Sequence, residues 1–464
     1  MKQVTVFCVV VVMWMVSGAS ANVEVFEICT GSAKQQNPSL DGRYTVWQDD
    51  RSGATNQDIY AYDLQTEHEF AVCTAPGRQR YPSISGDLIV WQDDRNSKWD
   101  IYGYDLSVEQ PQDREFVISE HPHNQEYPAV SGRFVIWGDR RNGTLDLYGY
   151  DLMDQVEFEI ASHPTVSLMQ PDIDGDWVVW YDDRSGLYQV YACRLEFPIP
   201  DGGFEVLHVS PSDNAQGFPS VSGDRVVWHQ QNSVGGYDIA GCNLQTGESF
   251  TVFEGGDGRY PSVSGTTVVW EDYRNGKDRT DIFGRDLASG GVFEISATVA
   301  KQARPVIDGQ TIIWQHNEDL WAAYLLEPTV LTVIWPDGGQ MLLAGSEQDI
   351  LWQTEGPALE QVKLEFSADD GTNWHVIEPN VPDTGAYVWQ IPEVDSPVCR
   401  VRVGDVGGSG AIGVSASVFT VFQCDPALTA DLNGDCRVDI ADFAVFAEQW
   451  TQCGNRYDPD WCWQ

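Results

Sequence analysis

Basic residues are scarce in this chain of 464 residues: 27 Lys and Arg stand against 70 Asp and Glu, a formal net charge of −43. Such a charge repels nucleic acids and anionic membranes, so we expect neither as a partner. Histidine is also scarce, with 8 residues, and the HExxH and GxSxG patterns of zinc peptidases and serine hydrolases are missing. We therefore assign no catalytic residue from the sequence.

Long hydrophobic runs are missing as well, with one exception near the start. An apolar run from Val4 to Val16 follows Lys2 and leads to Ala19-Ser20-Ala21. The run is shorter than the ~20 residues that a membrane span needs. A short apolar run with a small-residue exit is typical of a secretory signal peptide over 1–21. We expect a secreted, extracellular or cell-surface protein without a transmembrane segment.

Cysteines concentrate toward the C-terminal end. Four of the ten lie in the last 41 residues, where they predict two disulfides of undetermined connectivity: Cys424, Cys436, Cys453 and Cys462. Two further pairs occupy matching repeat positions, and whether they are bonded is left open by the sequence: Cys29 with Cys73, and Cys193 with Cys242.

A repeat of about 44 residues fills most of the chain. The segment PSLDGRYTVWQDDRSGATNQDIYAYDL recurs as PSISGDLIVWQDDRNSKWDIYGYDL, and five further copies follow. The tryptophans of the seven copies are Trp47, Trp91, Trp137, Trp180, Trp228, Trp270 and Trp314. Repeats of this length with several β-branched strands each are typical of propeller blades.

The seventh copy lacks a fourth strand, and an apolar segment at Val25–Ile28 precedes the first copy. We expect this N-terminal strand to complete the last blade and close the ring, which leaves no long sheet edge open. The prediction for 22–327 is an all-β, seven-bladed propeller.

The pattern P-S-x-S-G-x-x-V-V-W-x-D-x-R-x-G-x-x-D-I-Y-x-Y-D-L resembles the TolB-type, WD-repeat-like propeller unit of secreted and periplasmic bacterial proteins. The resemblance implies a β-propeller fold. Propellers of this type serve as binding scaffolds, signalling parts and occasional polysaccharide lyases or hydrolases, so function has to be argued from the site.

Three polar features of the repeat are candidates for function. The first is an Asp two residues after Trp with an Arg four residues after it, as in Asp49 and Arg51, which we interpret mainly as a turn and inter-blade contact. The second is a pair of histidines at positions where the repeat departs from this pattern, His229 and His316. They either belong to a metal or acid–base site or reflect drift of the repeat sequence. The third is a set of alternating tyrosines, which stack on sugars or fill space between blades.

After the repeat, 328–423 contains short strands separated by Gly, Pro and Asp turns, which favours an immunoglobulin-like β-sandwich. The region resembles the Ig-like modules of secreted bacterial enzymes and cell-wall proteins. Within it, SADDGTNW is similar to the Asp-box hairpin of sialidases, which we interpret as a structural turn.

The tail, 424–464, contains the most specific motif. TADLNGDCRVDIADFAVFAEQW places oxygen ligands at the spacing of a calcium loop: Asp431, Asn433, Asp435, Arg437 through its carbonyl, Asp439 and Asp442. An apolar helical stripe with Phe443 and Phe446 follows. The segment is similar to a type I dockerin segment, a small helical, EF-hand-like module, and this implies Ca²⁺ and a cohesin-like partner. Only one such segment is evident.

The sequence thus predicts a non-catalytic binding protein engaged in extracellular polysaccharide work. The propeller would recognise a polysaccharide or protein, and the calcium-loaded tail would anchor the chain to a partner or surface. Two alternatives stay open: a polysaccharide lyase or glycoside hydrolase with its site in the propeller funnel, and a structural protein of the cell envelope.

Overall fold

The computed structural model describes residues 22–29, 33–326, 329–356, 358–407, 410–424, 429–432, 436 and 438–450. These residues form 37 strands, a short 3-10 helix at Pro111–Asp113 and the α-helix α1 at Ile440–Trp450. In this part of the chain no helix has the length and apolar character to cross a membrane. The predicted signal peptide lies outside the described residues. The chain divides into two compact units, Met1–Leu326 and Glu327–Gln464.

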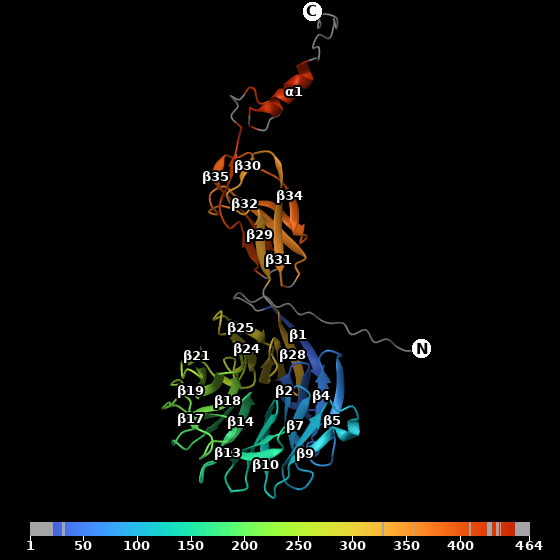
Figure 1. Ribbon diagram of the computed structural model, residues 1–464, viewed down its shortest axis with the longest axis vertical. Coiled ribbons are helices and arrows are strands. Elements are labelled where there is room, and N and C mark those ends of the chain that lie inside the picture. The colour runs from blue at the N-terminus through green and yellow to red at the C-terminus, as the bar shows by residue number, and fades with distance from the viewer. Residues whose placement is uncertain are drawn as a thin grey trace, which may run out of the picture. The chain divides into compact units, whose positions relative to one another are not determined.

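The first unit consists of four-stranded antiparallel sheets in a propeller-like arrangement, seven of them among the described residues (Figure 1). The first three sheets are β2–β5 (Gln35–Asp41, Tyr44–Asp49, Asp58–Asp63, His68–Cys73), β6–β9 (Gln79–Ser85, Leu88–Asp93, Asp100–Asp105, Glu115–Ser119) and β10–β13 (Gln125–Ser131, Phe134–Asp139, Asp146–Asp151, Val156–Ala161). The next three are β14–β17 (Met169–Asp174, Trp177–Asp182, Gln189–Arg194, Val206–His208), β18–β21 (Gln216–Ser222, Arg225–Gln231, Tyr237–Asn243, Ser249–Phe253) and β22–β25 (Gly258–Ser264, Thr267–Asp272, Asp281–Asp286, Val292–Ser296).

The seventh sheet joins the two ends of the unit. It contains β26 (Gln302–Asp308), β27 (Thr311–His316), β28 (Asp319–Leu326) and β1 (Asn22–Cys29). Strand β1 pairs antiparallel with β28, with Asn22 opposite Leu326 and Glu27 opposite Trp321. The N-terminal strand expected from the sequence therefore supplies the fourth strand of this sheet.

The second strand of each sheet is apolar on both faces because neighbouring sheets cover it. The seven repeat tryptophans lie on these strands and are at most 1% exposed. One core cluster joins Val46 and Ile59 of the first sheet to Ile84, Ile89 and Trp91 of the second. Burial of this kind contributes roughly 25 cal/mol per Å² of apolar surface, so sheet-to-sheet packing is the main stabilising contact of the unit.

The second unit contains two sheets around a shared core. One consists of β29 (Val330–Trp335), β31 (Glu347–Glu355) and β34 (Ala386–Gln390). The other consists of β30 (Met341–Leu343), β37 (Phe419–Phe422), β35 (Ser396–Asp405), β32 (Gln361–Ser367) and β33 (His375–Pro382), with β36 (Ile412–Val414) paired to β35. Trp352 of the first sheet and Phe366 and Phe419 of the second belong to one buried cluster.

Two of the four tail cysteines for which two disulfides are predicted, Cys453 and Cys462, lie outside the described residues. Cys424 and Cys436 form a disulfide. The repeat cysteines are free thiols: Cys29, Cys73, Cys193 and Cys242. Cys193 and Cys242 are fully enclosed in two different core clusters, so each serves as a small apolar side chain.

Candidate functional site

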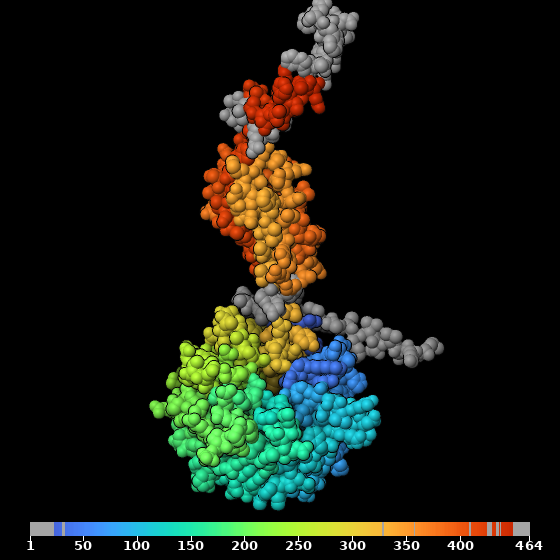
Figure 2. Space-filling model, viewed as in Figure 1, coloured from blue at the N-terminus to red at the C-terminus, as the bar shows by residue number. Residues whose placement is uncertain are grey.

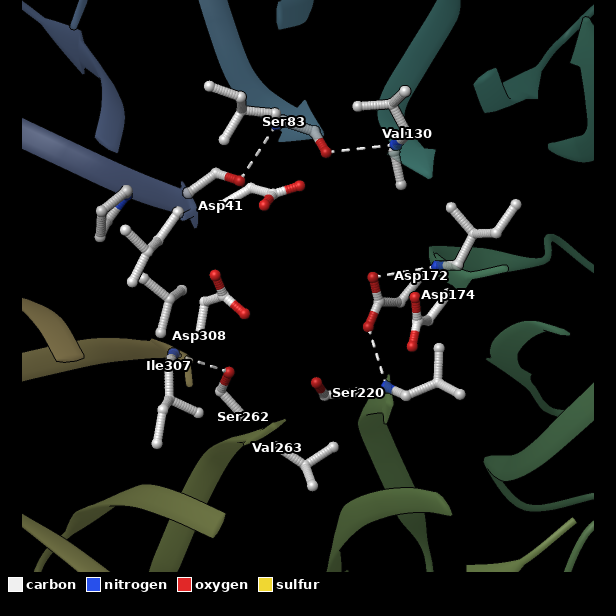
Figure 3. Close-up of a pocket in the computed structure, with 18 of the residues that line it drawn as sticks. Asp41, Ser83, Val130, Asp172, Asp174, Ser220, Ser262, Val263, Ile307 and Asp308 are labelled. Carbon is white, nitrogen blue, oxygen red and sulfur yellow. Dashed lines mark hydrogen bonds between the residues drawn. The ribbon is translucent and has the colours of Figure 1, made fainter. Parts of the chain in front are cut away.

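A pocket of about 560 Å³ lies where the first strands of the seven sheets come together (Figure 3). Strands β2, β6, β10, β14, β18, β22 and β26 each contribute the same run of five positions, such as 37–41 in β2 and 304–308 in β26. No single repeat makes this pocket. Its chemistry therefore depends on the positions at which the repeats differ.

One end of the pocket is formed by a set of side chains that we call the collar. The collar residues immediately precede the buried proline of each repeat: Asn37, Tyr81, Tyr127, Gln170, Phe218, Tyr260 and Arg304. All seven have positive φ, between 43° and 57°. The strand register shifts at the same place in every sheet. A bulge of this type re-aims a side chain, and positive φ in a non-glycine residue before proline is costly.

In four sheets the residue that follows the tryptophan accepts the collar N–H of the next sheet: Gln48, Gln92, His229 and Glu271. Gln92 Oε1 accepts the Tyr127 N–H at 2.8 Å, and Gln48 Oε1 accepts the Tyr81 N–H at 3.3 Å. In the fifth sheet His229 takes this place, and its Nδ1 accepts the Tyr260 N–H at 3.5 Å. Burial together with two nearby arginines lowers the pKa of His229 to about 3. His229 is therefore a neutral structural acceptor that replaces glutamine.

The collar side chains pack on one another in two groups. Tyr81 and Tyr127 lie edge to face with ring centroids 5.0 Å apart. Phe218 and Tyr260 do the same at 4.6 Å, and the Arg304 guanidinium stacks 3.8 Å above the Tyr260 ring. The collar thus offers fixed aromatic surfaces that are half-buried, a suitable lining for a flat ligand.

The other end of the pocket carries a ring of hydrogen bonds between sheets. The last residue of each first strand accepts the N–H of the turn glycine in the next sheet, at 2.6–3.2 Å. The acceptors are Asp41, Ser85, Ser131, Asp174, Ser222, Ser264 and Asp308. The bond from Gly42 N–H to Asp308 Oδ2, 2.6 Å, links the first sheet to the seventh.

Asp172 breaks the repeat between these two ends. The equivalent positions hold small residues, for example Ser39 and Ser83, whose hydroxyls accept an N–H of the next sheet at 3.2–3.3 Å. Asp172 Oδ2 accepts the Val221 N–H in the same way at 3.0 Å (Figure 3). Burial raises the pKa of Asp172 to about 6. The pocket therefore contains one carboxyl group that titrates close to neutral pH.

The repeating Asp and Arg residues do not form a ligand-binding rim. Asp49 is fully buried; its Oδ2 accepts the indole N–H of Trp47 at 3.0 Å and its Oδ1 accepts the Arg51 N–H at 2.8 Å. The Arg51 guanidinium closes a salt bridge to the same carboxylate and covers the Tyr60 ring at 3.8 Å. These contacts support the structural interpretation of the Asp and Arg residues and of this tyrosine.

The second repeat-breaking histidine has no part in the pocket. His316 stacks on Trp321 of the same sheet, with centroids 4.3 Å apart, and burial lowers its pKa. It replaces the buried Asp that five of the other sheets carry, and among the described residues the indole N–H of Trp314 has no hydrogen-bond partner. Among the described residues no cluster of potential metal ligands includes His229 or His316.

The predicted calcium loop is described only in part. Asn433, Asp435 and Arg437 lie outside the described residues. Asp442, 3% exposed, accepts the Leu432 N–H at 2.7 Å through Oδ1 and the Asp439 N–H at 2.7 Å through Oδ2.

Asp431 Oδ2 accepts the Cys436 N–H at 2.7 Å. Through its contact with Leu432, Asp442 lies beside the residue that follows Asp431. Cys424, Asp431 and Cys436 also lie together, but both cysteines are in the disulfide and neither is available as a metal ligand.

The sequence reasoning missed the collar, and a signal for it was present. The residue before the repeat proline is tyrosine in three copies and Asn, Gln, Phe or Arg in the other four, while all seven copies keep the proline. This position has the same backbone role in every sheet but carries different side chains. Seven similar units can build one asymmetric site at such a position.

The comparisons concern the fold. No protein-family profile and no curated protein matches the chain. Similar solved structures include an oligogalacturonate lyase in complex with manganese, 13% identical with a TM-score of 0.50, over 66% of this chain and 94% of that chain. Another is the β-propeller domain of the Trilobed protease from Pyrococcus furiosus, 12% identical with a TM-score of 0.46, over 63% and 93%.

TolB from Acinetobacter baumannii is also similar, 16% identical with a TM-score of 0.41, over 59% of this chain. The match spans 65% of the TolB chain. At these identities the likeness shows the fold alone. The four-stranded sheets of the first unit confirm the expected propeller-like fold. The Ig-like and dockerin-like assignments remain predictions.

Proposed function

We propose that the chain is a secreted, non-catalytic binding protein whose central pocket recognises an extracellular oligosaccharide. The observation that carries the proposal is the collar. Seven side chains are held at one end of the pocket by a costly backbone conformation, and four of them are aromatic. Aromatic rings stack on the apolar faces of sugars. Serine hydroxyls and carboxylates below them accept hydrogen bonds from sugar hydroxyls.

The proposal includes a closed, seven-bladed propeller as the scaffold. The bond between Gly42 and Asp308 and the pairing of β1 with β28 support closure of the ring. A closed ring covers both faces of every sheet with neighbouring sheets, and it fixes the seven collar positions relative to one another. This rigidity reduces the entropy that the protein loses when a ligand binds.

The second unit would be an Ig-like spacer followed by a dockerin-like anchor. The strand order β30-β37-β35-β32-β33 facing β29-β31-β34 supports the first assignment, because strands distant in the chain are neighbours in a two-sheet sandwich. The contact that brings Asp442 to Leu432 supports a Ca²⁺ site made by Asp431, Asn433, Asp435, Arg437, Asp439 and Asp442. A cohesin-like or cell-surface protein would be its partner.

A second candidate function is polysaccharide cleavage as a lyase or hydrolase. Asp172 favours it, because a carboxyl group with a raised pKa near other carboxylates is the usual acid of glycoside cleavage. The similar oligogalacturonate lyase structure gives this candidate a precedent on a related fold.

The test is binding of oligosaccharides from neutral and acidic polysaccharides to the full mature chain with calcium, followed by analysis of the ligand after release. Retention of intact ligand, lost in Tyr81→Ala and kept in Tyr44→Ala, is expected; Tyr44 lies on β3 outside the pocket. Shortened ligand would instead establish cleavage. Failure to retain any glycan would overturn the assignment and leave the structural envelope protein as the better account.

A further inference from the structure

Arg304 differs from every other charged residue of the pocket lining. The remaining charged residues there are acidic: Asp41, Asp172, Asp174 and Asp308. The Arg304 guanidinium stacks on Tyr260 at 3.8 Å and lies 5.4 Å from the Phe218 ring centroid. Stacking on the ring fixes the plane of the guanidinium, and its N–H donors point outward in that plane. Among the described residues those donors have neither a hydrogen bond nor an ion pair.

The acidic side chain nearest in the fold is already engaged. Glu271 is 1% exposed and accepts the Tyr273 hydroxyl at 2.7 Å through Oε1. Its Oε2 accepts the main-chain N–H of Arg304 at 3.4 Å, so it supports the collar backbone and makes no ion pair with the guanidinium in the described structure. An arginine left unpaired in a chain of net charge −43 stands out, because carboxylates are abundant around it.

The charge of the pocket is therefore separated along its length. Arg304 and Asp308 lie on the same strand, β26, four residues apart, which corresponds to about 13 Å at ~3.3 Å per residue. Figure 3 shows the side chains of Asp41, Asp172 and Asp308 around the pocket, and Asp41 and Asp308 belong to the ring of inter-sheet hydrogen bonds at the other end. An anionic group on a ligand is repelled there and attracted at Arg304. Hydroxyl groups are favoured at the acidic end, because carboxylates accept hydrogen bonds from them.

We infer that Arg304 selects oligosaccharides that carry an anionic group, a uronate carboxylate or a sulfate ester, and binds that group at the collar end of the pocket. This inference rests on the proposed recognition of oligosaccharides. Guanidinium donors match two oxygens of such a group at once, while lysine supplies only a point charge. The neighbouring aromatic rings would stack on the sugar that carries the anion.

The experiment is isothermal titration of the full mature chain with three matched probes: a uronate oligosaccharide, the same oligosaccharide with its carboxyl groups reduced to alcohols, and a sulfated form of the reduced oligosaccharide. Wild-type protein is expected to prefer an anionic probe. Arg304→Gln should weaken that probe about ten- to hundredfold, as for a lost charged hydrogen bond, and leave the reduced probe within about twofold. Arg304→Lys should recover only part of the loss.

The matched control is Arg194→Gln, because Arg194 is a surface arginine paired with Asp176 outside the pocket. Arg194→Gln should change neither the affinity for the anionic probe nor the affinity for the reduced probe. Preference for the uronate or for the sulfate probe identifies which anion is the ligand. Equal binding of all probes with no effect of Arg304→Gln would overturn the role of Arg304 and leave oligosaccharide recognition standing. No binding of any probe would overturn both. Melting curves of each variant separate a binding defect from a folding defect.

Discussion

Replacing Asp172 by the residue that the repeat uses elsewhere tests the account of the pocket. Serine at the equivalent positions 39 and 83 accepts the same inter-sheet N–H, so Asp172→Ser keeps the bond to Val221. It removes a carboxyl group whose pKa is raised from 3.8 to about 6 by burial. The variant should therefore be more stable than wild type at neutral pH.

The size of the gain follows from the shift. The pKa of Asp172 is about two units above its usual value, and a pKa difference of one unit changes the free energy of unfolding by about 1.4 kcal/mol. The full effect on the free energy of unfolding is therefore roughly 3 kcal/mol. This is an upper bound, because Asp172 faces a pocket that water enters, and we expect about 1–2 kcal/mol. The folded protein holds the proton more tightly than the unfolded chain, so wild-type stability falls as the pH rises from about 4 to about 6. The stability advantage of Asp172→Ser over wild type should therefore grow as the pH rises from about 4 to about 6.

The assay is calorimetry of the propeller transition between pH 4 and pH 7. At about 2–4 °C per kcal/mol, Asp172→Ser should melt a few degrees above wild type at pH 7 and close to it at pH 4. Ser83→Ala is the control at an equivalent position; it removes one hydrogen bond and should lower Tm equally at both pH values. An Asp172→Ser variant that is less stable at pH 7, or gains equally at pH 4, would refute the reasoning.

Three further predictions concern the repeat and the tail. Asp93→Ala leaves the Trp91 indole N–H without its buried acceptor and removes one of the two carboxylates that pair with Arg95, which keeps Glu115, and it should cost about 2–3 kcal/mol in urea unfolding; a loss below 1 kcal/mol would contradict the structural role. His229→Gln should leave glycan affinity unchanged. It should also flatten the loss of stability that wild type shows as the pH falls from about 6.5 to 3, because the folded His229 resists protonation and the unfolded one does not; a change in affinity would instead place His229 in the binding site. Titration of the full chain with Ca²⁺ should show one tight site that Asp431→Ala abolishes, and an unaltered titration would remove the calcium assignment.

The repeat allowed the sheets to be predicted from the sequence, whereas the collar was missed. Apolar strands around Trp47 and its equivalents recur because each sheet needs the same contacts with its neighbours, and a fixed period makes such positions visible. The N-terminal strand was predictable because the seventh repeat lacked one. The collar depends on a backbone conformation before proline that disagrees with the usual preference of that position, so local propensity hides it.

The two histidines were considered as functional residues but have structural roles. His229 and His316 attracted attention because they depart from the repeat and titrate near neutral pH as free residues. In the structure one replaces a glutamine acceptor and the other stacks on Trp321. Asp172, an equally clear departure, was not singled out because the sequence contains many acidic residues, and its burial follows only from the fold.

The pairing of β1 with β28 has a consequence for how the protein is made. Residues 22 and 326 lie opposite each other, so this sheet cannot form until about 300 residues of chain are available. Closing a loop of that length costs about 2 kcal/mol more than closing one of a single repeat. Six sheets can assemble from local hairpins as the chain emerges, while β1 has no partner strand until β28 is made. Ring closure is therefore a late and slow folding step, and a chain interrupted before β28 would leave β1 as an unpaired strand prone to aggregation.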